Sequence, residues 1–144
     1  MGTMNPDFYD LFINQFNSMD YRSLGWKTKK DQEIRFEKIF EIGISPGDSV
    51  LDIGSGLSDF YFFLREKIGD FSYVGIEPKE QFYSVSKVRY SDYGNFKVLK
   101  KSISEPVEDF PSADWVVASG LFPFKQPKYY RNFAAKSLLH CAYF

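Results

Sequence analysis

Short apolar runs and helical spacings of hydrophobic residues follow one another along this chain. Four apolar runs predict strands at 49–53, 71–76, 96–99 and 114–119, and a fifth strand is expected to begin within 140–144. Apolar side chains three and four positions apart predict helices at 5–19, 28–42, 60–67, 79–90 and 130–138. This alternation predicts an α/β protein with a parallel sheet, helices on both of its faces and right-handed crossovers.

Two of these helices carry more specific signals. Thr28 and Asp31 have the spacing of a capping box, so a helix is expected to begin at this point. The helix over 79–90 is expected to use Phe82, Val85 and Val88 as its inward apolar positions.

A glycine turn follows the first predicted strand directly. Gly54 and Gly56 come after the apolar residues Val50, Leu51 and Ile53, and a helical pattern then begins. Glycine lets backbone amides approach a ligand closely, and the start of a helix presents unpaired N–H groups. In an open α/β sheet, a nucleotide-like ligand binds at this place.

Two acidic residues narrow the choice of ligand. Asp52 stands just before the turn, where it would repel a pyrophosphate but can bind an ammonium group. Glu77 ends the second predicted strand, where a carboxylate can accept hydrogen bonds from two ribose hydroxyls. Asp59 replaces the third glycine of a dinucleotide fingerprint. A nucleoside with an amino-acid tail, S-adenosylmethionine, therefore fits better than NAD.

Three stretches of the chain resemble the motifs of class I S-adenosylmethionine-dependent methyltransferases. Residues 50–56 resemble the first motif, 73–78 the acidic ribose motif and 114–122 the fourth-strand motif. The approach to the first motif, with Leu24, Gly25, Trp26, Gln32, Arg35 and Phe36, is similar to that of one bacterial subgroup. The resemblance covers about residues 20 to 144 and implies a Rossmann-like fold, but it specifies no substrate.

The resemblance implies a role for matching positions at the first two strands. Asp52 would hold the methionine moiety of the cofactor together with the turn backbone, at Gly54, Ser55 and Gly56. Glu77 would bind the ribose, and Pro78 would shape the flank of that subsite.

Further positions are implied around the rest of the pocket. Ser102 and Ile103, after the third strand, would face the adenine, and Ser119, at the end of the fourth, would lie near the methyl group and its acceptor. Asp59 and Phe60 would line the pocket from the helix start.

The chain also departs from this family. Ser58 takes the place of a third motif glycine, and Ser102 replaces an aspartate that binds the adenine amino group in many members. The sequence stops at Phe144, after about the fifth strand, where members usually continue. We therefore expect either self-association into a homo-oligomer or a fragment of a longer protein, because an uncovered sheet edge favours aggregation.

Composition excludes several classes of function. The net charge of −1 argues against nucleic acid as a partner, and no stretch approaches the roughly 18 apolar residues of a membrane span. With one histidine, His140, and one cysteine, Cys141, the chain offers no zinc site and no internal disulfide. A reducing, cytoplasmic location is expected.

Two organisations and several functions remain open. Residues 1–27 are expected to form a helix and loop that either pack on the domain edge or act as a lid, and residues 28–144 are expected to form the cofactor-binding domain.

The favoured function is methyl transfer from S-adenosylmethionine to a small-molecule acceptor, with no assigned base. The alternatives are a non-catalytic cofactor-binding module that works through self-association or a partner, and an NAD-dependent oxidoreductase, which Asp52 and Asp59 disfavour.

Overall fold

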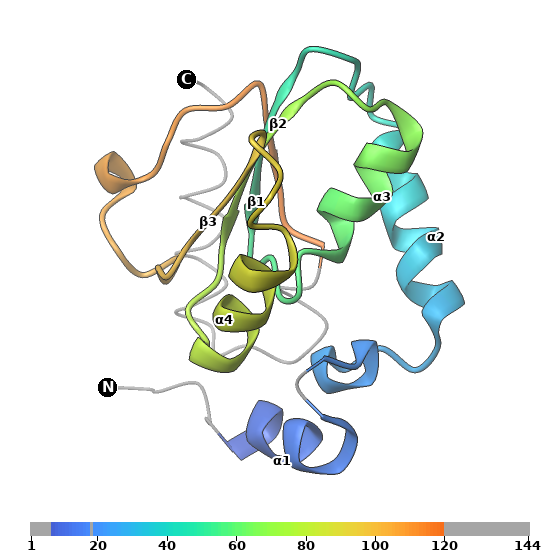
Figure 1. Cartoon of the computed structure of the whole chain (residues 1–144), viewed down its shortest axis with the longest axis vertical. Helices are drawn as coiled ribbons and strands as arrows, with labels where there is room; N and C mark the ends of the chain where they lie inside the picture. The colour runs from blue at the N-terminus through green and yellow to red at the C-terminus, as the bar shows by residue number, and fades with distance from the viewer. Residues whose placement is uncertain (1–6, 18, 120–144) are drawn as a thin grey trace.

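The computed structural model describes residues 7–17 and 19–119, and a four-stranded parallel sheet lies at their centre (Figure 1). The strand order is β3-β2-β1-β4, so β1 pairs with both β2 and β4. The strands are β1 (Ser49–Ile53), β2 (Ser72–Ile76), β3 (Phe96–Leu99) and β4 (Trp115–Val117). The predicted α/β fold with a parallel sheet is confirmed.

Helices alternate with these strands close to the predicted places. They are α1 (Asp7–Phe16), η1 (Tyr21–Leu24), α2 (Lys29–Phe40), α3 (Asp59–Lys67), α4 (Glu80–Arg89) and η2 (Val107–Asp109). The capping signal is confirmed, because the Thr28 hydroxyl accepts a 3.1 Å hydrogen bond from the backbone N–H of Asp31. The helix predicted over 130–138, the strand predicted within 140–144, and His140 and Cys141 lie outside the described residues.

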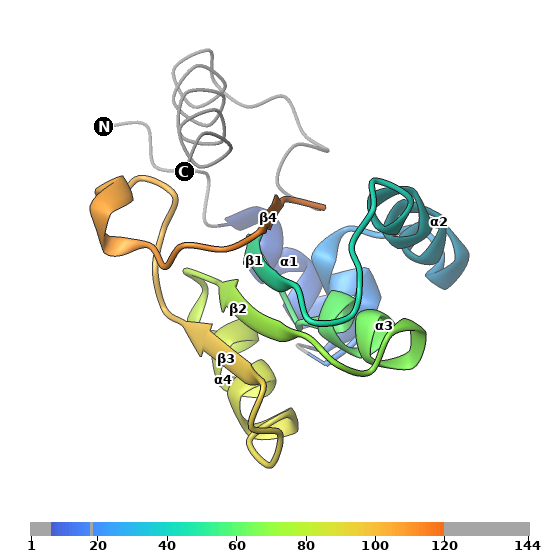
Figure 2. The same cartoon turned by 90° about the horizontal axis from the view of Figure 1, so that it is seen from above.

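The two faces of the sheet are covered differently within the described part of the chain. Helices α2, α3 and α4 lie on one face, and the segment that contains η2 lies on the other (Figure 2). The helical face is rich in aromatic residues. The ring of Tyr61 is fully buried between those of Phe71, Tyr73, Tyr90 and Phe96, at centroid distances of 4.9 to 5.5 Å.

The second face has a smaller, aliphatic core. Leu51, Ile53 and Ile76 point to it from β1 and β2, and they pack with residues from the segment after β3 that include Ile103 and Phe110. Because both faces of β1 are covered, its sequence is a nearly continuous apolar run, as expected for a central parallel strand.

The prediction for the inward face of α4 is wrong at one position. Val88 is 76% exposed, whereas Phe82, Ser86 and Tyr90 are buried. These three residues are four positions apart and therefore share one face of the helix. A serine occupies this buried face because its hydroxyl donates a 2.9 Å hydrogen bond to the carbonyl of Gly56, where α4 approaches the glycine turn.

Polar bonds fix β1 and β4 at their amino ends. The carboxylate of Asp114 accepts hydrogen bonds from the backbone N–H and hydroxyl of Ser49, at 2.8 and 2.9 Å, and the Asp114 N–H donates to the same hydroxyl at 2.8 Å. The indole of Trp115 donates to Asp48 at 2.8 Å. These bonds set the register that brings the carboxyl ends of the two strands level.

None of the helices in the described part of the chain is long and apolar enough to cross a membrane.

Candidate functional site

The glycine turn joins β1 to α3 in a conformation that few residues adopt. Gly54 and Gly56 have φ values of +69° and +57°, and Ser58, just before the helix, has +58°. The N–H groups of Gly54 and Ser55 both donate to the carbonyl of Ile76, at 2.8 and 3.0 Å. The turn is therefore held against the end of β2, beside Glu77.

Two glycines of this region are also required by close contacts. A Cβ on Gly56 would lie 2.7 Å from a methyl carbon of Leu24, so η1 rests directly on the turn. A Cβ on Gly75, in β2, would lie 2.6 Å from the hydroxyl of Ser55. Such distances are shorter than van der Waals contact, so a Cβ at either position would displace the neighbouring side chain.

Asp52 lies beneath the turn rather than on its surface. Its side chain is 1% exposed, and its Oδ2 accepts a 2.6 Å hydrogen bond from the hydroxyl of Tyr73. Among the described residues its Oδ1 has no hydrogen-bond partner. Burial raises the pKa of Asp52 to about 7, against the opposing effect of the Tyr73 hydrogen bond, and the charge of Glu77 raises it further.

Glu77 links the turn to the start of α4. One carboxylate oxygen accepts a 2.8 Å hydrogen bond from the N–H of Gly56, and the other accepts a 2.9 Å bond from the N–H of Lys79. The residue is 6% exposed. Burial raises the pKa of Glu77 to about 7, although both backbone hydrogen bonds act in the opposite direction. Two carboxyl groups with raised pKa values thus lie beside one glycine turn.

The two residues predicted to line the pocket from the start of α3 make other contacts. The carboxylate of Asp59 accepts hydrogen bonds from Gln32 at 2.9 Å and from Arg89 at 3.4 Å, and thereby joins α2, α3 and α4. The ring of Phe60 is 1% exposed and packs on Phe36 at 5.1 Å. These contacts give both residues a structural role in fixing the start of α3.

The remaining predicted residues lie after the ends of their strands. Pro78 is exposed beside Glu77. Ser102 is partly exposed, and its N–H donates to the carboxylate of Glu105. Ile103 packs on the aliphatic core. The carbonyl of Ser119 accepts a 3.3 Å hydrogen bond from the guanidinium of Arg35.

Direct contacts therefore connect only part of the predicted set. The turn residues, Asp52 and Glu77 form one continuous group, because Gly56 binds Glu77 and the turn packs over the end of β2. The residues after β3 and β4 share the same edge of the sheet, since carboxyl ends of parallel strands meet there. Their contacts with a ligand stay predictions.

The sequence reasoning missed Tyr73, Gly75 and Lys79 as parts of this site. Tyr73 could have been found from strand alternation, because it points to the same face of the sheet as Asp52 once β1 and β2 are paired in register. The contact between Gly75 and Ser55 has no local signal, because it depends on how the turn folds back on β2.

Within residues 7–17 and 19–119, no three His, Cys, Asp or Glu side chains are grouped so that they could hold a metal ion.

Comparisons with known proteins address the fold. The chain is similar to the crystal structure of YjhP from Escherichia coli, with a TM-score of 0.62 at 16% identity, over 95% of this chain and 51% of that one. It is also similar to a putative RNA methyltransferase, PH1948 from Pyrococcus horikoshii, with a TM-score of 0.60 at 18% identity, over 78% and 56% of the two chains.

A third similar structure contains a cofactor product. Coclaurine N-methyltransferase, bound to N-methylheliamine and SAH, has a TM-score of 0.53 at 17% identity, over 60% of this chain and 26% of that one. The chain has the Rossmann-like fold of class I S-adenosylmethionine-dependent methyltransferases. It spans about half the length of the first two structures. No protein-family model and no curated protein matches the sequence.

Proposed function

We propose that this chain binds S-adenosylmethionine at the glycine turn and transfers its methyl group to a small-molecule acceptor. The observation that carries the proposal is the bond between Gly56 and Glu77. It joins the turn that would approach the methionine moiety to the carboxylate that would bind the ribose, so one rigid unit presents both subsites.

The charge of the site supports this cofactor over NAD. Asp52 and Glu77 are buried carboxyl groups with raised pKa values, and Asp52 has an oxygen without a hydrogen-bond partner in the described region. A sulfonium and an ammonium group nearby would stabilise the ionised forms of both, whereas a diphosphate would be repelled. The residues present therefore fit a cationic nucleoside ligand.

In this proposal the residues around the turn bind different parts of the cofactor. Asp52 supplies negative charge beneath the ammonium, the backbone from Gly54 to Gly56 approaches the amino-acid tail, and Glu77 accepts the ribose hydroxyls beside Pro78. Ser102 and Ile103 would flank the adenine, and Ser119 would lie nearest to the acceptor. Asp59 and Phe60 would support the pocket by holding the start of α3 in place.

The chemistry that the cofactor supplies when bound is an activated methyl group. The protein then has to position the acceptor in line with the carbon–sulfur bond and to exclude water. Arg35, whose guanidinium lies 5.7 Å above the ring of Trp26 and donates to the carbonyl of Ser119, holds the end of β4 at this place.

A small-molecule acceptor is favoured by charge. The net charge of −1 argues against the strongly basic stripe that nucleic-acid binding usually needs. The structures similar to this chain include both a putative RNA methyltransferase and an N-methyltransferase bound to N-methylheliamine, so the fold itself permits either class of acceptor.

Titration calorimetry tests the cofactor. S-adenosylmethionine and S-adenosylhomocysteine are expected to bind saturably, and NAD is not. If none of the three binds to the folded chain, the proposal is wrong. If the cofactor binds but incubation with small-molecule acceptors yields no S-adenosylhomocysteine, the chain is a cofactor-binding module that works with a partner or a second copy.

A further inference from the structure

Helix α1 lies beyond the carboxyl ends of the strands, at the lower end of the view in Figure 1. Two contacts hold it to the beginning of α4. The carboxylate of Asp10 forms a 2.6 Å ion pair with the ammonium group of Lys79, and the ring of Tyr9 meets that of Phe82 edge-on at 5.9 Å. Lys79 and Phe82 follow Glu77 closely in sequence. Helix α1 is therefore fastened beside the proposed ribose subsite.

Tyr9 also experiences the charge of Glu77. Burial raises the pKa of Tyr9 to about 12, and the negative charge of Glu77 contributes to this rise. Glu77 is only 6% exposed, although its hydrogen bonds to two backbone N–H groups leave lone pairs that could accept further donors. Helix α1 is thus fastened at the edge of the sheet from which ribose hydroxyls would approach the carboxylate.

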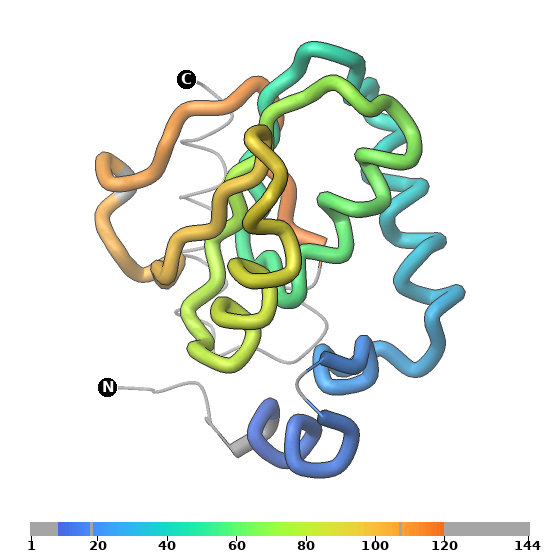
Figure 3. Tube along the Cα trace, in the orientation of Figure 1, coloured from blue at the N-terminus to red at the C-terminus, as the bar shows by residue number. Residues whose placement is uncertain are grey.

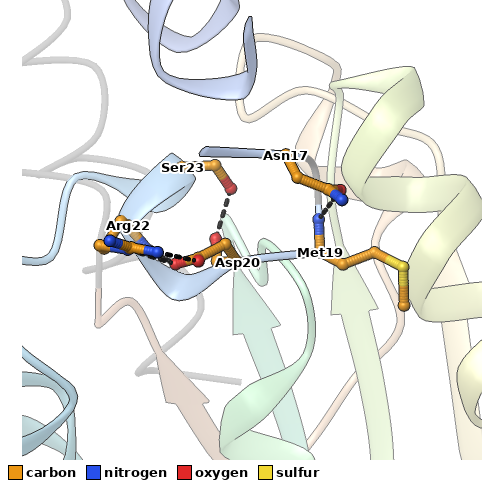
Figure 4. A network of polar contacts seen from close by, with 5 residues as sticks. All are labelled: Asn17, Met19, Asp20, Arg22 and Ser23. Carbon is orange, nitrogen blue, oxygen red and sulfur yellow. Dashed lines mark hydrogen bonds and ion pairs between the residues drawn. The ribbon is translucent and has the colours of Figure 1, made fainter. Parts of the chain in front are cut away.

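Polar contacts join residues between α1 and η1 (Figure 4). Asn17 has a φ of +79°, and its side chain accepts a 3.0 Å hydrogen bond from the N–H of Met19. Asp20 then caps η1 and binds the guanidinium of Arg22 at 2.7 Å. The turn at Asn17 therefore separates α1 from η1.

By contrast, η1 is anchored in the domain. Ser23 is fully buried, and Leu24 packs on Gly56 of the glycine turn. The path of the chain from η1 to α2 can be followed in Figure 3. A movement of α1 about Asn17 would break the contacts of Tyr9 and Asp10 with Phe82 and Lys79, and also the packing of α1 on η1, which includes the stacking of Arg22 on Phe16 at 4.6 Å.

We propose that α1 is a gate, latched by the ion pair between Asp10 and Lys79, which must open before the cofactor can reach Glu77. This inference rests on the proposed function, since it concerns how the same site is filled. The latch is weak, because the side chain of Asp10 is 42% exposed and that of Lys79 is 18% exposed. A partly exposed ion pair changes an equilibrium by about two- to five-fold, which suits a contact that has to open repeatedly.

The test compares the full chain with D10N, a substitution outside the proposed binding residues. E41Q is the matched control, because Glu41 forms a 2.9 Å ion pair with Lys38 on exposed α2 side chains. Two quantities are measured for each protein: hydrogen exchange of the α1 amides without ligand, and the association rate of S-adenosylhomocysteine by stopped-flow at low and high salt.

We expect D10N to speed exchange in α1 and to raise the association rate about two- to five-fold at low salt. High salt should raise the wild-type rate towards that of D10N because it screens the latch, and E41Q should behave as wild type. Binding by D10N alone would support the gate still more strongly.

Other outcomes separate the two proposals. If α1 exchanges faster in D10N but the association rate is unchanged, there is no gate, and the cofactor site stands. If exchange in α1 is also unchanged, the ion pair is not a latch. If neither wild type nor D10N binds S-adenosylhomocysteine, although hydrogen exchange shows that α1 is released in D10N, the proposed function is wrong. The gate proposal then fails with it.

Discussion

The hydroxyl of Tyr73 donates a 2.6 Å hydrogen bond to the carboxylate of Asp52, and each side chain is only 1% exposed. The bond crosses from β2 to β1 directly beneath the glycine turn. It is the one hydrogen bond to the Asp52 side chain among the described residues, and it leaves Oδ1 without a partner. Among the described residues, Tyr73 is therefore the one donor that offsets the burial of this acid.

Removing that donor should destabilise the fold measurably. Y73F keeps the ring but leaves a buried carboxylate unpaired, which is expected to lower the free energy of unfolding by about 1–3 kcal/mol at pH 8. Urea denaturation measures this loss. Y83F, on a partly exposed tyrosine of α4, is the control and should change stability by less than about 0.5 kcal/mol. Equal effects of both substitutions would contradict a special role for Tyr73.

The raised pKa of Asp52 predicts how stability depends on pH. In the unfolded chain this carboxyl ionises near pH 3.8, whereas in the folded chain its pKa is about 7. Between these values the folded state binds more protons than the unfolded state, so the free energy of unfolding should fall as pH rises from about 4 to 7. Asp52 alone would contribute at most about 4 kcal/mol to this fall.

The substitution D52N isolates this contribution. Asparagine does not ionise, so the loss of stability between pH 4 and 7 should be smaller in D52N than in wild type, as measured by urea denaturation at several pH values. Glu77 acts in the same direction over the same range, so a residual slope is expected. Asp20, whose pKa is lowered to about 2 by its bonds with Arg22, loses its contribution only below this range. An identical slope in both proteins would refute the assignment.

The contact of Leu24 with Gly56 predicts a difference between two glycines of similar conformation. Gly56 and Gly69 have φ values of +57° and +70°, so alanine at either position costs about 1 kcal/mol of backbone strain. Only at Gly56 would the new Cβ meet another side chain, at 2.7 Å. G56A should therefore lose about 1 kcal/mol more than G69A.

A double-mutant cycle tests whether Leu24 causes this extra loss of stability in G56A. Because the obstructing atom is a methyl group of Leu24, combining G56A with L24A should remove most of the difference from G69A. Urea denaturation of wild type, G56A, L24A, the double variant and G69A provides the numbers. If L24A does not compensate, the cost of G56A comes from the turn itself and not from its packing against η1.

The bonds of Glu77 predict its contribution to cofactor affinity. In E77Q one charged oxygen is replaced by an amide group, which cannot accept from the backbone N–H that this oxygen binds. The dissociation constant for S-adenosylhomocysteine should rise by the equivalent of about 1–3 kcal/mol. E80Q is the control, because Glu80 is an exposed residue of α4 that pairs with Lys100. Calorimetry that finds equal affinities for wild type and E77Q would remove Glu77 from the ribose subsite.

Much of the fold could be predicted because its signals are local. The strand at Ser49–Ile53 is an apolar run bounded by turn residues, and its predicted bounds match the structure. Thr28 marks the start of α2 through a bond that spans three residues. The glycine turn is equally local, since Gly54 and Gly56 reveal their conformation in sequence alone.

The features that the sequence does not reveal involve contacts between distant segments. Ser86 is buried in place of an apolar residue because α4 approaches the carbonyl of Gly56, and no periodicity in α4 indicates this. Asp59 has a charge that suits a ligand, yet its partners are Gln32 and Arg89, each about thirty positions away. Local sequence thus predicts the glycine turn and the strand ends, and tertiary contacts decide which other groups each side chain meets.

The bonds between Ser49 and Asp114 bear on how the chain folds. They join residues 65 positions apart, whereas β1 meets β2 and β2 meets β3 across much shorter loops. Closing the longer loop loses more chain entropy and delays pairing, so β4 is expected to dock after the other three strands have assembled. Trp115 lies at this junction, with its indole bonded to Asp48. The late stage of refolding therefore has a built-in fluorescent reporter at the amino ends of the strands, opposite the edge that carries the candidate site.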